Sequence, residues 1–415
     1  MNGVAVTGIG VATPAGIGLD ALWTSVERTR SCITEIDRFD PSGYACPAAG
    51  QANFTAAEHL PTRLIKRTDR FTHLAVFTAR QALADAGVTI GVDVAPERAG
   101  VMVGNVLGGW EFAERELRKL WVEGVRAVSP YQATAWFPAA PQGNICIDLD
   151  IKGPARTFIA DRASGAYAIL RGAATVLRGQ ADVVLAGGVE APLSPYGWLC
   201  LETSGMMAKA RADQQPHALY RPFDARHGGT VFGEGGIFLV LERYESARRR
   251  GAEVYGEIAG WGLSTDGYMP YYTVEPTGRV LARAMRAAAT RSGIALSEVG
   301  AVFAHGSGIP VEDVTEGYAI REVFGDAADH IPVTAPKAGF GHLLGAAAPV
   351  DVALALRAMR LGQVPATVNL ERPAPGLDLD LVQGRPRNIG SWEHSLVVSR
   401  GLGGVNACLI VRREK

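Results

Sequence analysis

Short apolar runs alternate with longer amphipathic segments along most of the chain. An apolar run of about four to eight residues between turn residues predicts a buried strand, and apolar residues three and four apart predict a helix. Strands are predicted at residues 4–10, 99–104, 156–160, 181–188, 235–241, 254–261 and 299–304, with a closing strand pair within 396–411. Helices are predicted at residues 20–28, 66–87, 108–124, 166–180, 277–291, 314–324 and 345–361. This alternation predicts an α/β protein whose strands are buried and largely parallel.

The pattern divides the chain into two halves of similar length. Each half contains strand–helix–strand units and closes with an antiparallel pair of strands. The charged run at residues 242–251, ERYESARRRG, is the best candidate for a linker between them. We therefore expect one unit over residues 1–250 and a second over 251–415, with residues 195–229 of the first rich in loops.

Composition narrows the class of protein and its partners. The chain has 415 residues, of which 47% are apolar and 20% charged, as in ordinary globular proteins. A net charge of −1 argues against binding to nucleic acid through broad electrostatics. Five scattered cysteines without a CxxC pair predict reduced thiols, and the strand-like start does not resemble a signal peptide. We expect a cytoplasmic protein without membrane contact, metal or cofactor.

The stretch from residue 156 to residue 188 organises the chain. It reads as strand, sharp turn, helix and strand, with the turn in the sequence DRASG at residues 161–165. Gly165, with the small residues before it, is expected to permit the turn. Such an elbow holds one side chain at the N-terminus of a helix, where the dipole favours a nucleophilic anion. That side chain is Arg162, which stays protonated and cannot act as a nucleophile.

Three further glycine-rich segments carry residues suited to a site. His305 lies in AHGSG, Lys337 and His342 lie in KAGFGHLLGAA, and Gly401, Leu402, Gly403 and Gly404 form the turn of SRGLGGVNA. Two neutral imidazoles aimed at one pocket can donate N–H groups to an oxyanion, and a lysine beside them can hold an acidic partner. Each segment alone is as consistent with a structural turn.

Together these segments resemble the β-ketoacyl synthases over nearly the whole chain. The similar stretches are VAVTGIGVATPAG, RPFDARHGGTVFGEGG, HGSGIPVED, KAGFGHLLGAA and SRGLGGVNA. The resemblance implies a thiolase fold of five layers, αβαβα, built from two similar halves. In active members the elbow reads TACASG or close to it, and its cysteine is acylated. Here Arg162 stands at the cysteine position, so the resemblance does not carry acylation across.

Within that family the chain resembles the chain-length factors of type II polyketide synthases. ELRKLW, YQATAWF, SPYGW and ALYRPFD are typical of these subunits, which also lack the elbow cysteine, usually having glutamine instead. The resemblance implies a heterodimer with a ketosynthase subunit that elongates chains on acyl carrier protein. It also implies that the strand after the elbow, residues 182–188, pairs across the dimer axis. Retention of His305, Lys337 and His342 is a departure from aromatic chain-length factors.

The resemblance also implies a set of gate residues. Trp110, Ala113 and Leu117 fall at i, i+3 and i+7 of the predicted helix, and the matching face borders the elongation tunnel in chain-length factors. Thr134 maps to the opposite wall. Ordinary packing of a dimer by an apolar stripe is the alternative interpretation.

Two other functions remain open at this stage. The first is a malonyl-carrier decarboxylase of ketosynthase fold, which would use His305 and His342 as oxyanion donors. The second is an inactivated homodimeric β-ketoacyl synthase. In the chain-length factor that the resemblance implies, His305, Lys337 and His342 are vestigial, because the cysteine that they would serve is absent. For Arg162 we expect an anionic partner, with Asp161 the nearest in sequence, and for Asp313 and Glu316 we expect structural roles at a helix start.

Overall fold

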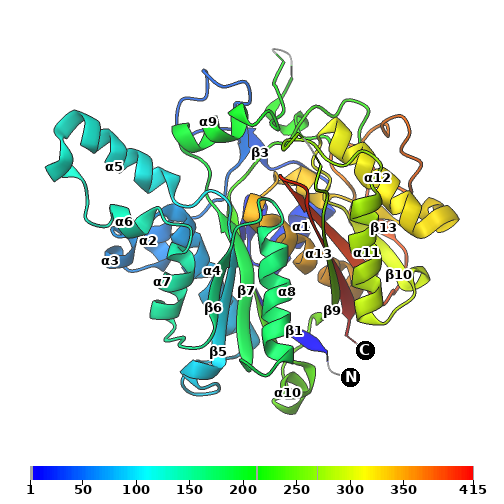
Figure 1. The fold of residues 1–415 in the computed structure, drawn as a ribbon, viewed down its shortest axis with the longest axis horizontal. Coiled ribbons are helices and arrows are strands. Elements are labelled where there is room, and N and C mark those ends of the chain that lie inside the picture. The colour runs from blue at the N-terminus through cyan, green and yellow to red at the C-terminus, as the bar shows by residue number, and fades with distance from the viewer. Residues whose placement is uncertain (1–2, 212–213, 269, 415) are drawn as a thin grey trace.

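The computed structural model describes residues 3–211, 214–268 and 270–414 (Figure 1). The main-sheet strands of the N-terminal half are β1 (Val4–Thr13), β5 (Ala99–Gly104), β6 (Ala155–Phe158), β7 (Val183–Glu190) and β8 (Gly235–Arg243). Those of the C-terminal half are β9 (Gly256–Thr265), β10 (Val299–Phe303), β11 (Val333–Thr334), β14 (His394–Gly401) and β15 (Val405–Arg413). They hydrogen-bond in the order β11-β10-β14-β15-β9-β1-β8-β7-β5-β6. The two halves join where residues 4–6 of β1 pair with residues 256–258 of β9.

The strand order repeats between the halves. If the strands above are numbered one to five within each half, both halves have the order 3-2-4-5-1 from their outer edge to their junction. Directions repeat as well: β5 is parallel to β6 and β7, as β10 is to β11 and β14. The other neighbours along this path are antiparallel, including the closing pairs β7–β8 and β14–β15. The prediction of two similar halves is confirmed. Four of the five strands in each half run in the same direction, as predicted, whereas β8 and β15 run opposite to the others of their half.

Helices form three layers around the strands. The outer layer of the N-terminal half contains α4 (Arg70–Ala86) and α7 (Ala140–Asp148), and that of the C-terminal half contains α11 (Arg279–Ser292) with α12 (Pro310–Phe324) beside it. Between the halves lie α8 (Ser164–Leu177) and α13 (Ala347–Leu361), which contact each other and strands of both halves. The result is the five-layered arrangement expected from the sequence (Figure 1).

The other described α-helices and strands are β2 (Gly16–Ile17), α1 (Leu19–Glu27), β3 (Ile33–Glu35), β4 (Ala48–Gly50), α2 (Ala56–His59), α3 (Thr62–Ile65), α5 (Trp110–Glu123), α6 (Gln132–Ala135), α9 (Pro195–Thr203), α10 (Tyr244–Arg249), β12 (Gln363–Val364) and β13 (Arg387–Asn388). In Figure 1, α5 projects from the body of the molecule. No described helix has the length and apolar character needed to cross a membrane.

One local expectation needs correction. The predicted linker at residues 242–251 is the end of β8 followed by α10, whose Ala247 is fully buried, so this segment packs against the body. The stretch expected to be loop-rich begins with α9, whose N-cap Ser194 accepts the N–H of Gly197 at 3.2 Å, and its described residues after α9 are mostly turns and coil, as predicted. The division of the chain at residue 250 stays a prediction.

The free edge of the N-terminal half is β6, whereas β7 pairs on both sides, with β5 and with β8. The expectation that residues 182–188 pair across a dimer axis is therefore wrong. A strand whose two neighbours are already in place has no backbone groups left for a partner. The strand before the elbow, not the strand after it, is the one open to further pairing.

Candidate functional site

The elbow has the predicted architecture but not the predicted source of strain. β6 ends at Phe158, α8 begins at Ser164, and Arg162 lies between them. The residue with a positive φ is Asp161, at 48°, and not Gly165. Gly165 serves close packing instead, because a Cβ there would lie 2.3 Å from the carbonyl oxygen of Gly345. The small residue is required where the N-terminus of α8 meets the loop before α13.

Arg162 is held in a buried ion-pair network. Its side chain is 1% exposed and makes two bonds to Glu312, Nη1 to Oε2 at 2.9 Å and Nη2 to Oε1 at 2.8 Å. Its Nε donates to Asp161 Oδ2 at 3.1 Å. Burial lowers the pKa of the guanidinium, but the two carboxylates outweigh burial and raise it. Burial likewise raises the pKa of Glu312, and Arg162 outweighs it, so the pair is ionised. The expected partner Asp161 is confirmed, and Glu312 is an unforeseen second one.

A second buried arginine completes the network. Arg400 is 2% exposed, and its Nε donates to Asn406 Oδ1 at 3.1 Å. Its Nη1 donates to the Thr315 hydroxyl at 3.0 Å, and its Nη2 lies 3.4 Å from Asp266 Oδ2. Together with the contacts of Arg162, two guanidinium groups and three carboxylates fill the space around the elbow. Buried charges in this number are tolerated only when they are paired.

The two histidines lie together behind the ion pair. The rings of His305 and His342 are 5.0 Å apart, and both side chains are buried. Burial lowers the pKa of each well below its usual value, and the nearby guanidinium lowers it further, so both are neutral. Nδ1 accepts a backbone N–H in each, from Arg400 at 3.4 Å and from Leu344 at 3.1 Å. The proton is thereby placed on Nε2, which has no hydrogen-bond partner in either ring.

Lys337 has the acidic partner that the sequence analysis allowed for. Its Nζ lies 2.8 Å from Asp351 Oδ2 and donates to the carbonyl oxygen of Ala304 at 2.6 Å. Burial raises the pKa of Asp351 to about 6, although the lysine opposes that shift. The lysine therefore fixes the backbone next to His305 and does not touch the elbow.

Asp313, in the first turn of α12, and Glu316, in its second turn, support the turn that carries His305. Glu316 accepts the N–H groups of His305 at 2.7 Å and Gly306 at 2.9 Å, and Asp313 accepts that of Gly308 at 3.0 Å. Burial raises the pKa of Glu316 to about 7 despite these two bonds. The predicted structural role of both acids is confirmed, although the groups that they bind belong to the turn rather than to their own helix.

The glycine loop closes over the elbow. Gly401 ends β14, and the turn over Leu402, Gly403 and Gly404 leads into β15. The Leu402 N–H donates to Asp161 Oδ2 at 2.7 Å, so the carboxylate that pairs with the guanidinium also anchors the loop. Both Gly403 and Gly404 have a positive φ, 75° and 80°, which the tight turn requires.

Three of the four predicted gate residues lie on α5, which is not one of the elements that surround the elbow. Ala113 is buried, Trp110 and Leu117 are partly exposed, and Thr134 is exposed on α6, which contacts α5. The Trp110 ring packs on that of Tyr196 in α9, with 4.8 Å between centroids. Trp110 and Leu117 are therefore partly accessible in the single chain, whereas Ala113 is not.

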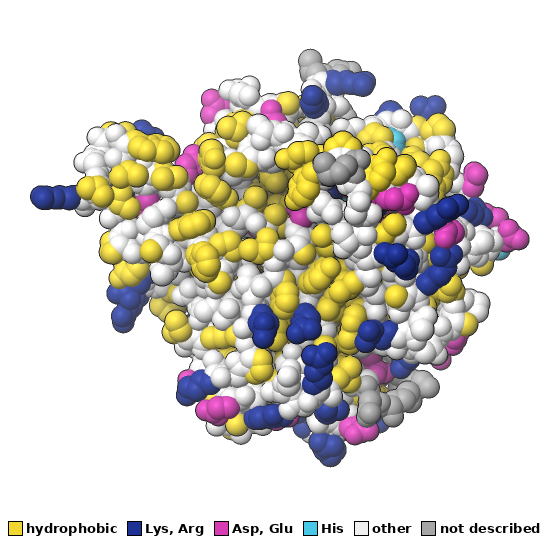
Figure 2. Space-filling model, in the orientation of Figure 1, with side chains coloured by type: hydrophobic (Ala, Val, Ile, Leu, Met, Phe, Trp, Pro, Cys, Tyr) yellow, Lys and Arg dark blue, Asp and Glu magenta, His cyan; other side chains and the backbone are white. Residues whose placement is uncertain are grey.

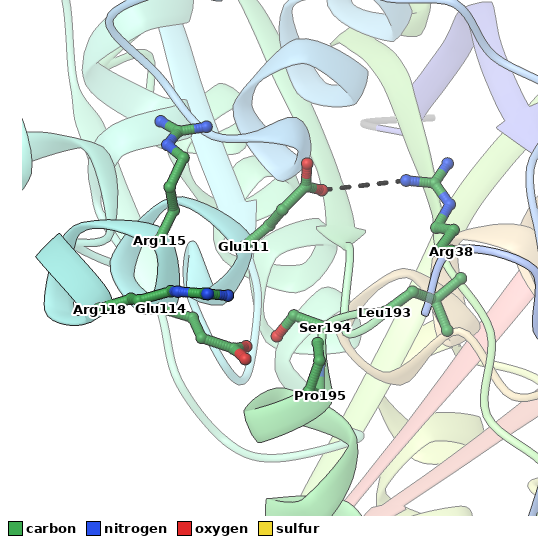
Figure 3. A pocket seen from close by; sticks show the side chains of 8 residues that line it. All are labelled: Arg38, Glu111, Glu114, Arg115, Arg118, Leu193, Ser194 and Pro195. Carbon is green, nitrogen blue, oxygen red and sulfur yellow. Dashed lines mark ion pairs between the residues drawn. The ribbon is translucent and has the colours of Figure 1, made fainter. Parts of the chain in front are cut away.

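A charged groove lies beside these residues (Figure 3). Its volume is about 470 Å³, and Arg38 and Glu111 face each other across it at 3.9 Å. Its other lining residues are Glu114, Arg115, Arg118, Leu193, Ser194 and Pro195. None of the four predicted gate residues lines this groove, whose charged walls do not suit an apolar chain.

None of the five cysteines replaces the missing nucleophile. Cys46 and Cys408 are buried, and burial raises the pKa of both thiols, that of Cys46 to about 11. Cys32, Cys146 and Cys200 are partly buried and lie outside the elbow. The described site can donate N–H groups and hold charge, but it presents no thiolate at the elbow.

The chain belongs to the β-ketoacyl synthase family. Models of the N-terminal and C-terminal domains of β-ketoacyl synthase match residues 1–247 and 255–371. The chain is 42% identical to the tetracenomycin polyketide synthase ketoacyl synthase beta subunit of Streptomyces glaucescens, over 99% of this chain and 98% of that protein. It is 34% identical to 3-oxoacyl-[acyl-carrier-protein] synthase 2 of Staphylococcus aureus (strain COL), over 99% and 98%.

Solved structures agree with this assignment over the full length. The ishigamide ketosynthase/chain length factor superposes with a TM-score of 0.91 at 29% identity, covering 100% of both chains. A type II polyketide synthase acyl-carrier protein in complex with its ketosynthase, bound to the hexaketide, gives a TM-score of 0.91 at 25% identity, again with full coverage. The thiolase fold of a ketosynthase is therefore established for this chain.

Proposed function

We propose that this chain is a non-acylating chain-length factor of a type II polyketide synthase. It pairs with a ketosynthase subunit, stabilises that subunit and shapes the tunnel in which the chain elongates. One observation carries the proposal: inside a ketosynthase fold, the nucleophile position holds Arg162 in a two-bond ion pair with Glu312. A guanidinium locked in this way cannot form a thioester, so condensation falls to the partner.

The single chain has surface suited to such a partner. β6 is an edge strand with unpaired backbone groups, and the Ile159 side chain that follows it is 61% exposed. Trp110 and Leu117 on α5 are also accessible. We place the gate at Trp110, Ala113, Leu117 and Thr134, and a partner covering α5 and α6 would enclose them. Five free cysteines fit a cytoplasmic location.

Incubation with a malonyl- or acyl-loaded carrier protein should leave the purified chain without an acyl adduct. The reason is that the elbow carries a guanidinium and none of the five cysteines lies there. Mass spectrometry of the intact protein measures the adduct, and carbon dioxide is followed in the same reaction. A stoichiometric adduct would contradict the proposal, and carbon dioxide release without a ketosynthase would favour the decarboxylase.

Expression of the chain alone should give mostly aggregated protein, whereas co-expression with its ketosynthase should give a soluble heterodimer. Exposed apolar side chains around an edge strand favour association with other chains. The measurement is the soluble fraction and its size by chromatography. A monodisperse monomer in the absence of any partner would show that the subunit is not obligate.

A further inference from the structure

The surface around edge strand β6 combines apolar side chains with unneutralised positive charge. We call it the edge face and define it by β6 with Ile147, Ile159, Tyr167, Arg156, Arg171 and Arg178. Ile147 of α7 is 83% exposed and Ile159 is 61% exposed. Tyr167, Arg171 and Arg178 lie along one stripe of α8 and the residue after it. In Figure 2, Lys and Arg side chains gather over the lower part of α8, with apolar side chains above and between them.

The three arginines of this face have no carboxylate of their own. Arg156 and Arg178 are exposed and Arg171 is partly exposed. The acids on neighbouring segments are already paired with other cations: Asp148 with Arg80, Asp150 with Lys152, and Asp182 with Arg98. Within the described residues, none of the three arginines of the edge face forms an ion pair with a carboxylate of the same chain.

A second copy of this chain does not suit the edge face. In a two-fold dimer the same patch lies on both subunits, so both sets of arginines would lie in one interface. Like charges brought together across an interface suppress that pairing. A strand suits this edge, because the outer N–H and C=O groups of β6 are a template for pairing with another backbone in extended conformation.

We propose that Arg156, Arg171 and Arg178 select a ketosynthase-fold partner that carries carboxylates at the facing positions, and that they oppose homodimers. This inference rests on the proposed function, since it concerns the partner of the same subunit. The apolar side chains and the edge of β6 stabilise the association, whereas the arginines determine which chain is bound. Attraction between opposite charges across the interface then adds to the affinity for the acidic partner alone.

A charge-reversed copy of this chain is the probe. Wild type with one affinity tag is co-expressed with Arg156→Glu/Arg171→Glu/Arg178→Glu carrying a second tag, and dimers are recovered through both tags and sized. The mixed pair should be recovered at least about tenfold better than two tagged wild-type copies, since a difference of one close charge pair corresponds to about that factor. The gain should shrink in about 1 M salt, where charges are screened within a few ångströms.

Arg279→Glu/Arg283→Glu/Arg385→Glu is the matched control, because these exposed arginines lie outside the edge face and change the net charge equally. Paired with wild type, it should give no more dimer than two wild-type copies. If the reversed copy misfolds, the neutral variant Arg156→Gln/Arg171→Gln/Arg178→Gln tests the same proposal. Two tagged copies of this variant should be recovered as a dimer in higher yield than two tagged wild-type copies. Equal recovery of all pairs would overturn the proposal. Product length is not measured, so this outcome is independent of the chain-length role.

Discussion

Glu312→Ala should lower the free energy of unfolding by about 3–5 kcal/mol, the usual cost of removing one partner of a buried ion pair. The substitution leaves the Arg162 guanidinium, 1% exposed, with Asp161 as its remaining carboxylate. For a chain of this length the melting temperature should fall by about 5 °C. Thermal melting followed by circular dichroism, with and without the partner subunit, measures the change.

Two variants separate the loss of a charge pair from the loss of an acid. Glu322→Ala removes an acid of the same helix whose bond to Arg286, at 2.9 Å, is largely in solvent. It should cost about 0–1 kcal/mol. Arg162→Met/Glu312→Leu removes both buried charges, and such replacements are often neutral or stabilising. A Glu312→Ala protein as stable as Glu322→Ala would show that the pair does not hold the elbow.

Trp110→Ala in the assembled complex should lengthen the polyketide by one or more ketide units. Trp110 is the bulkiest of the four proposed gate residues, and its ring rests on Tyr196 at the accessible side of α5. Because Trp110 is only partly buried, its loss should cost less than the roughly 3–5 kcal/mol of a fully buried aromatic residue. Product mass from complexes that remain intact by chromatography is the measurement.

The helix offers a matched control for that experiment. Trp121 lies on the same face, about 16 Å further along, and is 76% exposed. Trp121→Ala should leave product length unchanged. Thr134→Trp should shorten the product, and it avoids the overpacking expected from a large residue at buried Ala113. An intact Trp110→Ala complex that makes only wild-type product would assign Trp110 to packing.

Much of the fold could be predicted from the sequence, because apolar periodicity determines which segments are strands and helices. The long strands and helices lie close to their predicted positions, and the glycine-rich motifs sit at the ends of strands as expected. Strand neighbours are a different matter. Residues 183–190 are all buried. A run of apolar residues shows that a strand is covered on both faces, but it does not show which strands lie beside it, so the pattern could not identify β6 as the edge strand.

The site could be predicted only in part for a related reason. Arg162, His305, Lys337 and His342 were found because they stand in glycine-rich turns. Glu312 was missed although it lies within the HGSGIPVED motif, since its partner is 150 residues away and nothing local indicates a pair. The sequence offered one sign of a further anionic group at this site, the second acid directly before Asp313. The elbow strain at Asp161 could not be foreseen because glycine is the residue that ordinarily takes a positive φ.

The bond between Arg162 and Glu312 also constrains how this protein can evolve. Some arginine codons become cysteine codons by a single base change, so the lost nucleophile looks easy to regain. That step would leave Glu312 buried without its main cation, and the protein would bear the stability loss before any catalytic benefit. Recovery of catalysis thus requires changes in both halves of the chain at once. Glu312 on α12 therefore makes the return to a catalytic subunit less favourable than the loss of catalysis was.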